Sequence, residues 1–249
     1  MEHISLSSQP IFHIGIFPIT NSIIATWVVM LILIIIGFIV SGSIKQIPST
    51  IQNIFEYAIE SLLSLMDSVT QDRIKTERFF PWVVTFFFFI LFSNWIELIP
   101  GFSAIGIKTV EDGKTAIIPF LRSANTDLNT TLALAIISVI MIQIFGIISL
   151  GFTKYAKKFI NFSSVIGFFL GLLEILSEIA RIISFSFRLF GNIFAGEVLL
   201  VVITFLIPYL LPIPFYGMEL FVGFIQALVF AMLTLVFMTV ATTSHEEAH

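Results

Sequence analysis

Five long runs of apolar residues divide this chain, and they restrict its fold more than any other feature of the sequence. They cover residues 23–40, 79–99, 128–152, 163–207 and 215–243. A helix needs about 20 apolar residues to cross the hydrocarbon core of a bilayer. The sequence therefore predicts an all-α polytopic membrane protein, with about five transmembrane helices in a single membrane domain over residues 1–249.

The charge content favours the same fold class and excludes several functions. Only 11% of the 249 residues are charged, against about 25% in soluble domains. The net charge is −4 and no basic cluster occurs, so we expect no nucleic-acid partner. The chain contains no cysteine, which excludes disulfides and thiolate metal ligands. We expect neither a cofactor nor a metal site.

Two segments need separate treatment. The run 163–207 is long enough for two short spans, but no cluster of glycine or proline divides it, so we expect one long, tilted helix. Residues 44–67 place apolar and acidic side chains at helical spacing, which predicts an amphipathic surface helix.

The basic residues of the connections predict the orientation in the membrane. Four lie in 41–78, three in 100–127 and three in 153–162, whereas the tail 1–22 has none. An outer N-terminus places seven of them inside and three outside. We therefore expect an outer N-terminal tail and an inner C-terminal tail, 244–249. Since no basic residue precedes the first run, we interpret that run as a retained span rather than a signal peptide.

Ionisable side chains within a span are costly and therefore indicate function. In the fourth run, polar residues recur at steps of three and four, which keeps them on one helix face. This stripe contains Glu174, Ser177, Glu178, Arg181, Ser184, Arg188 and Asn192. Glu178 and Arg181 could simply pair within the helix. Arg188 has no acidic neighbour on the stripe, and an arginine keeps its charge at any accessible pH.

The prolines at 208, 212 and 214 predict a hairpin turn between the last two spans. Such a turn brings Gln226 to the level of Arg188 and Glu219 to the level of Glu197. The two glutamates could be interfacial residues that reach toward water. The functional interpretation is two half-paths lined by carboxylates, one from each side of the membrane, separated by the fixed charge of Arg188.

Specific motifs in the last two spans resemble a known family. The run Arg188-Leu-Phe-Gly-Asn192-Ile-Phe-Ala-Gly-Glu197, with Gln226-Ala-Leu-Val-Phe after it, closely resembles the subunit a family of F-type ATP synthases. The segments 92–101 (FSNWIELIPG) and 123–131 (SANTDLNTT) are also similar to family signatures.

The resemblance implies a proton-translocating stator subunit and assigns roles to seven residues. Arg188 would be the stator arginine and Gln226 its neighbour. Asn192, Glu197 and Glu219 would line the outer half-channel. Glu174 and Arg181 match polar positions of the inner half-channel.

The resemblance also implies partners: a ring of c subunits, which the long tilted hairpin would face, and the b subunits of the peripheral stalk. Segment 51–66 would be an additional helix on the inner side. The sequence has no glycine-rich phosphate loop, so nucleotide chemistry would belong to partner subunits and this chain would not itself be an enzyme. We expect a bacterial plasma membrane rather than a mitochondrial inner membrane. We expect protons as the transported ion, with Na+ as the alternative, because the binding site of the ring mainly decides between them.

Two other interpretations compete with this one. A stand-alone proton-coupled secondary transporter would also carry intramembrane carboxylates, although it usually shows inverted repeats and broken helices. His245-Glu-Glu-Ala-His249 matches the zinc-protease pattern H-E-x-x-H, but a solvated acidic tail is the simpler interpretation. The four phenylalanines 86–89 are most simply lipid-facing or part of a packed surface.

Overall fold

The computed structural model describes residues 8–15, 17–42, 50–99, 106–111, 114–119, 122–159, 165–208 and 210–243. These residues form seven α-helices, one short 3-10 helix and two β-hairpins. In chain order they are β1 (Pro10–Ile14), β2 (Phe17–Thr20), α1 (Asn21–Gly42), α2 (Thr50–Thr70), α3 (Arg73–Glu97), β3 (Gly106–Glu111), β4 (Lys114–Pro119), η1 (Ala124–Thr126), α4 (Leu128–Leu150), α5 (Phe152–Phe159), α6 (Val165–Leu206) and α7 (Pro212–Thr242).

The predicted fold class is confirmed. Five helices, α1, α3, α4, α6 and α7, are long and apolar enough to cross a membrane. The run 163–207 forms the single 42-residue helix α6, and α7 begins at Pro212, a position where the missing N–H costs nothing. The two small antiparallel hairpins, β1–β2 and β3–β4, were not indicated by the sequence.

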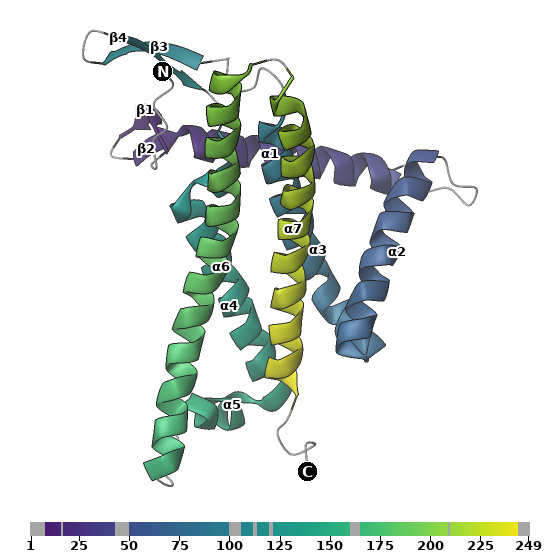
Figure 1. Ribbon diagram of the computed structural model, residues 1–249. Helices are drawn as coiled ribbons and strands as arrows, with labels where there is room; N and C mark the ends of the chain where they lie inside the picture. Colours follow the sequence, from purple (N-terminus) through teal and green to yellow (C-terminus); the bar gives the residue numbers. More distant parts are fainter. Residues whose placement is uncertain are drawn as a thin grey trace.

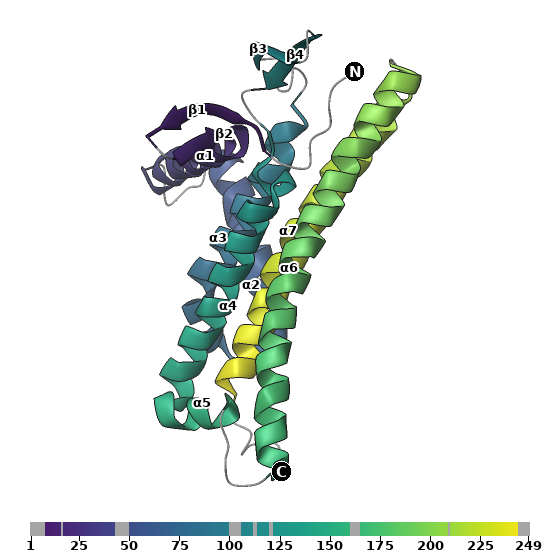
Figure 2. The ribbon, with the colours of Figure 1, turned by 90° about the vertical axis from the view of Figure 1, so that its left-hand side faces the viewer.

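Helices α3, α4, α6 and α7 run side by side as an array (Figures 1 and 2). The upper end of the array holds the connection from α6 to α7, and the lower end holds α5, which joins α4 to α6 (Figure 1). Helices α6 and α7 form a long hairpin, so residues near the turn belong to the upper end.

Helix α1 differs from the other long helices in direction. It crosses near the upper end of the array at a large angle, and Figure 2 views it almost along its axis (Figures 1 and 2). Only its first turns are buried, at Asn21, Ser22, Ala25 and Val29. Within the described residues, burial is therefore concentrated at the beginning of α1.

Helix α2 corresponds to the predicted amphipathic segment 44–67, of which residues 44–49 lie outside the described residues. From Thr50 the helix runs down toward the start of α3 (Figure 1). Its apolar residues Leu62 and Met66 are buried in the common core, which explains why this face turns toward the other helices.

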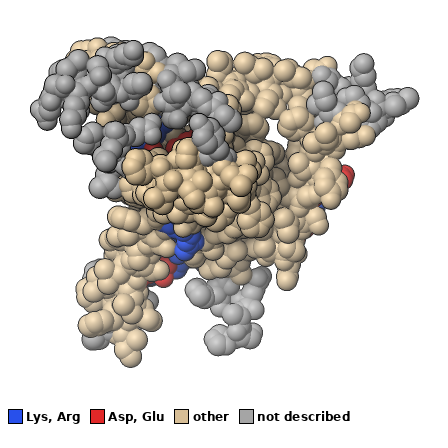
Figure 3. All heavy atoms as spheres, turned by 45° about the horizontal axis from the view of Figure 1, so that its top comes forward, with Lys and Arg blue, Asp and Glu red and all other residues tan. Residues whose placement is uncertain are grey.

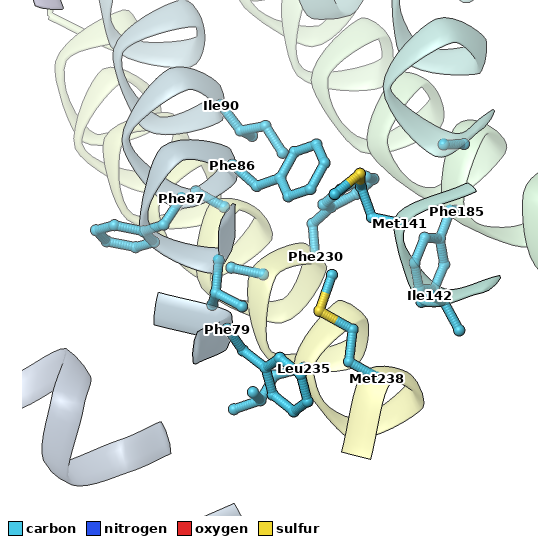
Figure 4. Close-up of a cluster of buried hydrophobic side chains, with 14 of the residues drawn as sticks. Phe79, Phe86, Phe87, Ile90, Met141, Ile142, Phe185, Phe230, Leu235 and Met238 are labelled. Atoms are coloured by element: carbon cyan, nitrogen blue, oxygen red, sulfur yellow. The ribbon is translucent and has the colours of Figure 1, made fainter. Parts of the chain in front are cut away.

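Aromatic side chains fill the space between the helices (Figure 4). The Phe86 ring of α3 lies 5.6 Å from the Phe230 ring of α7, and the Phe185 ring of α6 lies 5.1 Å from Phe230. Phe86 and Phe87 are buried, so the first half of the run 86–89 belongs to the core and does not face lipid. On the face seen in Figure 3, uncharged residues cover most of the described surface, and charged atoms occur in small groups.

Candidate functional site

Arg188 lies on α6 with its side chain exposed. Its Nη2 atom donates a hydrogen bond of 3.2 Å to the Ser184 hydroxyl, one turn earlier. Within the described part of the chain, no carboxylate lies within ion-pair distance of the guanidinium. This arginine therefore presents a positive charge that the described residues leave without a counter-charge.

Gln226 of α7 lies opposite α6 one turn above Arg188. The Asn192 Nδ2 atom donates to Gln226 Oε1 at 2.7 Å. Asn192, rather than Arg188, is thus the hydrogen-bond partner of Gln226. The Gln226 side chain is buried, and its Nε2 atom has no hydrogen-bond partner within the part of the chain that the structure describes.

Glu219 of α7 packs directly against Gly196 of α6. A Cβ atom built at Gly196 would overlap the Glu219 carboxylate, so the missing side chain is what leaves room for it. Glu219 is only 7% exposed. The hairpin therefore places Glu219 beside Gly196, the residue before Glu197. The sequence predicted that Glu219 would lie at the level of Glu197, so the prediction is correct to within one residue.

A second set of contacts gathers more charge at the upper end. Arg122 Nη2 lies 2.9 Å from Glu197 Oε2. Glu97, the last residue of α3, lies within electrostatic range of three side chains, those of Glu197, Arg122 and Glu219. We call Glu97, Arg122, Glu197 and Glu219 the upper cluster.

The sequence analysis did not identify Glu97 or Arg122 as site residues. Glu97 is part of the segment 92–101, where it is the single charged residue, and a lone carboxylate closing an apolar run is the signal that could have revealed it. Arg122 lies in a connection, and nothing in its local sequence indicates its partner.

A buried amide, Asn94, and the indole of Trp95 hold α7 in register with α3 beside the upper cluster. Asn94 Nδ2 donates to the Gly223 carbonyl at 3.0 Å, and Trp95 Nε1 donates to the Leu220 carbonyl at 3.0 Å. Asn125 Nδ2 donates to Asn94 Oδ1 at 2.7 Å. Because both carbonyls follow Glu219 within about one turn, these bonds fix the position of its backbone.

The lower half of α6 carries ion pairs instead of an excess of carboxylates. Glu174 Oε1 lies 2.7 Å from Lys158 Nζ of α5. Arg181 donates to both oxygens of Glu178, at 2.8 and 2.7 Å, so the pairing considered from the sequence is formed. The Arg181 guanidinium also lies 3.9 Å from the centre of the Phe237 ring. We call Lys158, Glu174, Glu178 and Arg181 the lower cluster.

Tyr155 anchors α5 next to the lower cluster. It is buried, and its hydroxyl donates to Gln143 Oε1 at 2.6 Å. Burial, followed by the negative charges of Glu178 and Glu174, raises the pKa of Tyr155 to about 12. The hydroxyl therefore remains a neutral hydrogen-bond donor at physiological pH.

Along α6, Arg188 separates the two clusters. At about 1.5 Å per residue, Glu197 lies about 14 Å toward the upper end and Glu174 about 21 Å toward the lower end. The structure thus brings Asn192 to Gln226 and Glu197 to the level of Glu219, but it holds Glu174 and Arg181 away from Arg188. No group of metal-binding side chains occurs among the described residues, and residues 245–249 of the zinc-like motif lie outside them.

Comparisons with a family model and with known proteins all point to one family. A family model described as ATP synthase A chain matches residues 23–239. ATP synthase subunit a of Moorella thermoacetica is 32% identical over 227 residues, which are 91% of this chain and 93% of the relative. The protein of the same name from Gloeobacter violaceus is 35% identical over 92% of this chain and 86% of its own length. The protein of the same name from Syntrophobacter fumaroxidans is 36% identical over 94% of this chain and 88% of its own length.

Proposed function

Because the chain belongs to the ATP synthase subunit a family, we propose that it is the proton-translocating stator subunit of a rotary F-type ATP synthase. In this proposal its upper and lower clusters belong to two aqueous half-channels that lead to and from the carboxylates of a c-subunit ring. The partners are that ring and the b subunits of the peripheral stalk. The chain performs no nucleotide chemistry itself.

One observation carries the proposal: Arg188 has no carboxylate partner among the described residues and lies on α6 between two groups of carboxylates. A charge without a counter-ion is expensive in a bilayer. A passing ring carboxylate would supply the missing counter-charge, because opposite charges attract strongly where water is scarce.

In the upper half of the path, protons arrive from the outer side at Glu219, Glu197 and Glu97. Three carboxylates lie near one arginine there, so a proton meets several closely spaced acceptors. The buried amide of Gln226, held by Asn192, lies between this cluster and the level of Arg188. Protons then neutralise a ring carboxylate, which moves away from the arginine.

In the lower half of the path, protons leave the ring and pass Glu174 to the inner side. Arg181 does not act as a proton carrier in this scheme, because it is bound by Glu178 and the Phe237 ring. The fixed charge of Arg188 blocks direct passage between the halves. Each proton that crosses 100 mV supplies about 2.3 kcal/mol, so several must be coupled to each ATP.

The alternative of a stand-alone secondary transporter receives no specific support. Such transporters commonly bind their substrate where membrane helices are broken. Here α6 and α7, which carry the candidate residues, are each one continuous helix. We place the complex in a bacterial plasma membrane, with the upper end outside and α5 inside, as the basic residues of α5 favour.

The test is Arg188→Ala in the assembled complex. We expect ATP-driven proton pumping into inverted membrane vesicles, followed with a pH-sensitive dye in sodium-free buffer, to fall to background. The amount of complex retained in the membrane should stay near that of the unmodified protein. Arg78→Ala, which removes an exposed arginine from the first turns of α3, is the matched control and should pump normally. Normal pumping by the Arg188 variant would overturn the proposal.

A further inference from the structure

Helix α5 is a short basic helix anchored at the lower end of the array. It lies crosswise between the end of α4 and the lower part of α6 (Figures 1 and 2). Its buried side chain is Tyr155, whose hydroxyl donates to Gln143 of α4. A Cβ atom at Gly146 would overlap the Tyr155 ring, so α4 is shaped to receive that ring. The other side chains of α5 therefore project from a helix that is held in one place.

The three lysines of α5 share one face of the helix. At about 100° per residue, positions 154, 157 and 158 fall within a sector of about 100°. Lys158 is paired with Glu174. The side chains of Lys154 and Lys157 are exposed, and Lys157 forms no ion pair with another described residue. Helix α5 contains no acidic residue, so this face presents positive charge to its surroundings.

Exposed apolar side chains border these lysines on both sides along the chain. Ile148 near the end of α4 and Phe152 at the start of α5 are exposed, and so are Phe168, Phe169 and Leu170 in α6. The last three are consecutive and therefore point in different directions around their helix. Such a surface suits hydrocarbon better than water. The lysines thus lie where hydrocarbon and water both approach, which is the position of lipid headgroups.

The turn from α2 to α3 is a useful contrast, because its charges compensate one another. Arg73 lies 2.6 Å from Asp67 Oδ2 and 3.0 Å from Glu77 Oε1. Lys75 lies 4.0 Å from Asp72 Oδ2. An anionic partner would meet carboxylates as well as cations at this turn. On α5 it would meet lysines alone.

We propose that the exposed face of α5 binds the headgroup of an anionic phospholipid from the inner leaflet. Lys154 and Lys157 hold the phosphate, and the acyl chains lie against the exposed apolar residues of α4 and α6. A phospholipid supplies both a negative charge and hydrocarbon, whereas a soluble anion supplies only the charge. Basic side chains near the membrane attract anionic lipids additively, so the two exposed lysines act together.

The experiment uses the purified complex in bilayer nanodiscs of phosphatidylcholine that contain a minor fraction of photoreactive lipid. The same photoreactive acyl chain is attached either to phosphatidylglycerol, which is anionic, or to phosphatidylcholine, which is not. After irradiation, mass spectrometry measures the labelling of α4, α5 and the start of α6 by each lipid. We expect phosphatidylglycerol to label this region about tenfold more than phosphatidylcholine does.

The variants test the lysines directly. Lys154→Gln combined with Lys157→Gln should remove the preference for phosphatidylglycerol, and the corresponding pair of changes to arginine should retain it. Lys157→Gln alone should lower the preference about threefold, which keeps the test valid if the double variant fails to assemble. Arg73→Gln combined with Lys75→Gln is the matched control. It removes the same number of charges from the turn between α2 and α3 and should leave the preference unchanged.

Three results would overturn the inference. They are equal labelling by the two lipids, an unchanged preference in both Lys157→Gln and the double glutamine variant, and an equal loss of preference in the Arg73 and Lys75 control. A further arm adds inorganic phosphate to the buffer. Loss of the preference there, but not with an equal ionic strength of chloride, would show a site for soluble anions instead of lipid. Because the readout is lipid binding, failure here leaves the proposed function standing.

Discussion

The clusters at the two ends of α6 differ in their ratio of carboxylates to cations. In the upper cluster, three carboxylates share the single cation Arg122, and Glu219 is buried. In the lower cluster, two carboxylates meet two cations, Lys158 and Arg181, and each is paired. The upper cluster thus has more carboxyl groups than cations, whereas the lower cluster has equal numbers.

Under the proposed function, this difference gives the two half-channels different surroundings. The upper one offers several closely spaced carboxylates, whereas each carboxylate of the lower one is held by a cation. The asymmetry arises from α3 and the connection before α4, which supply Glu97 and Arg122 to one end only.

The largest effect should come from Gly196→Ala, which disturbs the upper cluster sterically. The added methyl group would occupy the space of the Glu219 carboxylate. We expect proton flux to fall by about tenfold or more, because the methyl group displaces the Glu219 carboxylate, whose position must be precise. Pumping by inverted vesicles is the measurement.

Two variants sharpen this test. Glu219→Asp shortens the side chain by one methylene, so adding it to Gly196→Ala should recover part of the flux. Gly217→Ala is the control, because an added Cβ there meets nothing within 4 Å. Equal damage from Gly217→Ala would show that the effect does not arise from contact with Glu219.

A smaller effect is expected from Glu97→Gln, which removes the carboxylate that the sequence did not reveal. If Glu97 shares protons with Glu197 and Glu219, the variant should lower flux several-fold while the complex still assembles. Glu219→Gln should act in the same direction and more strongly. Glu77→Gln, an exposed glutamate of the same helix, should have no effect. Unchanged flux in Glu97→Gln would show that Glu97 does not take part in proton transfer, which would leave Glu197 of α6 and Glu219 of α7.

The smallest effect concerns Tyr155, at the lower end. Its pKa is raised to about 12, mainly by burial, so the folded state favours the neutral phenol. The unfolded chain loses this proton near its ordinary value of about 10. The stabilisation is therefore complete below about pH 10 and is lost between about pH 10 and 12.

Tyrosinate absorbance of the detergent-solubilised protein checks this value. Subtracting the titration of Tyr155→Phe from that of the unmodified protein should isolate a transition near pH 12. A transition near pH 10 would show that the hydroxyl is accessible to water. Proton flux at neutral pH should be almost the same in both proteins, since the phenol is neutral there.

The relative positions of the polar residues on the last two spans could be predicted from the sequence, because they depend only on helical periodicity and on the place of one turn. Uninterrupted apolar spacing predicts the continuity of α6, and the prolines near 208 fix the levels of Glu197 and Glu219 to within one residue. The polar stripe likewise indicated the pairing of Glu178 with Arg181. These features are local or follow from simple geometry.

Contacts between distant segments could not be derived in this way. Glu97 meets Arg122 and Glu197 only because α3, a connection and α6 converge at one end of the array. Lys158 reaches Glu174 because a buried tyrosine fixes α5. The large angle of α1 was likewise not indicated by its apolar run, and among the described residues its burial is limited to positions between Asn21 and Val29.

The unbroken length of α6 has a geometrical consequence for the path of the proton. A helix of 42 residues measures about 63 Å, roughly twice the hydrocarbon thickness of a bilayer. If most of that length stays within the membrane, the helix must lean far from the normal, and its two ends are displaced sideways as well as in depth. Entrance and exit then stand over different points of the membrane plane. Under the proposed function, a proton that enters at one could not reach the other by moving along the membrane normal, and it would need a carrier that travels laterally.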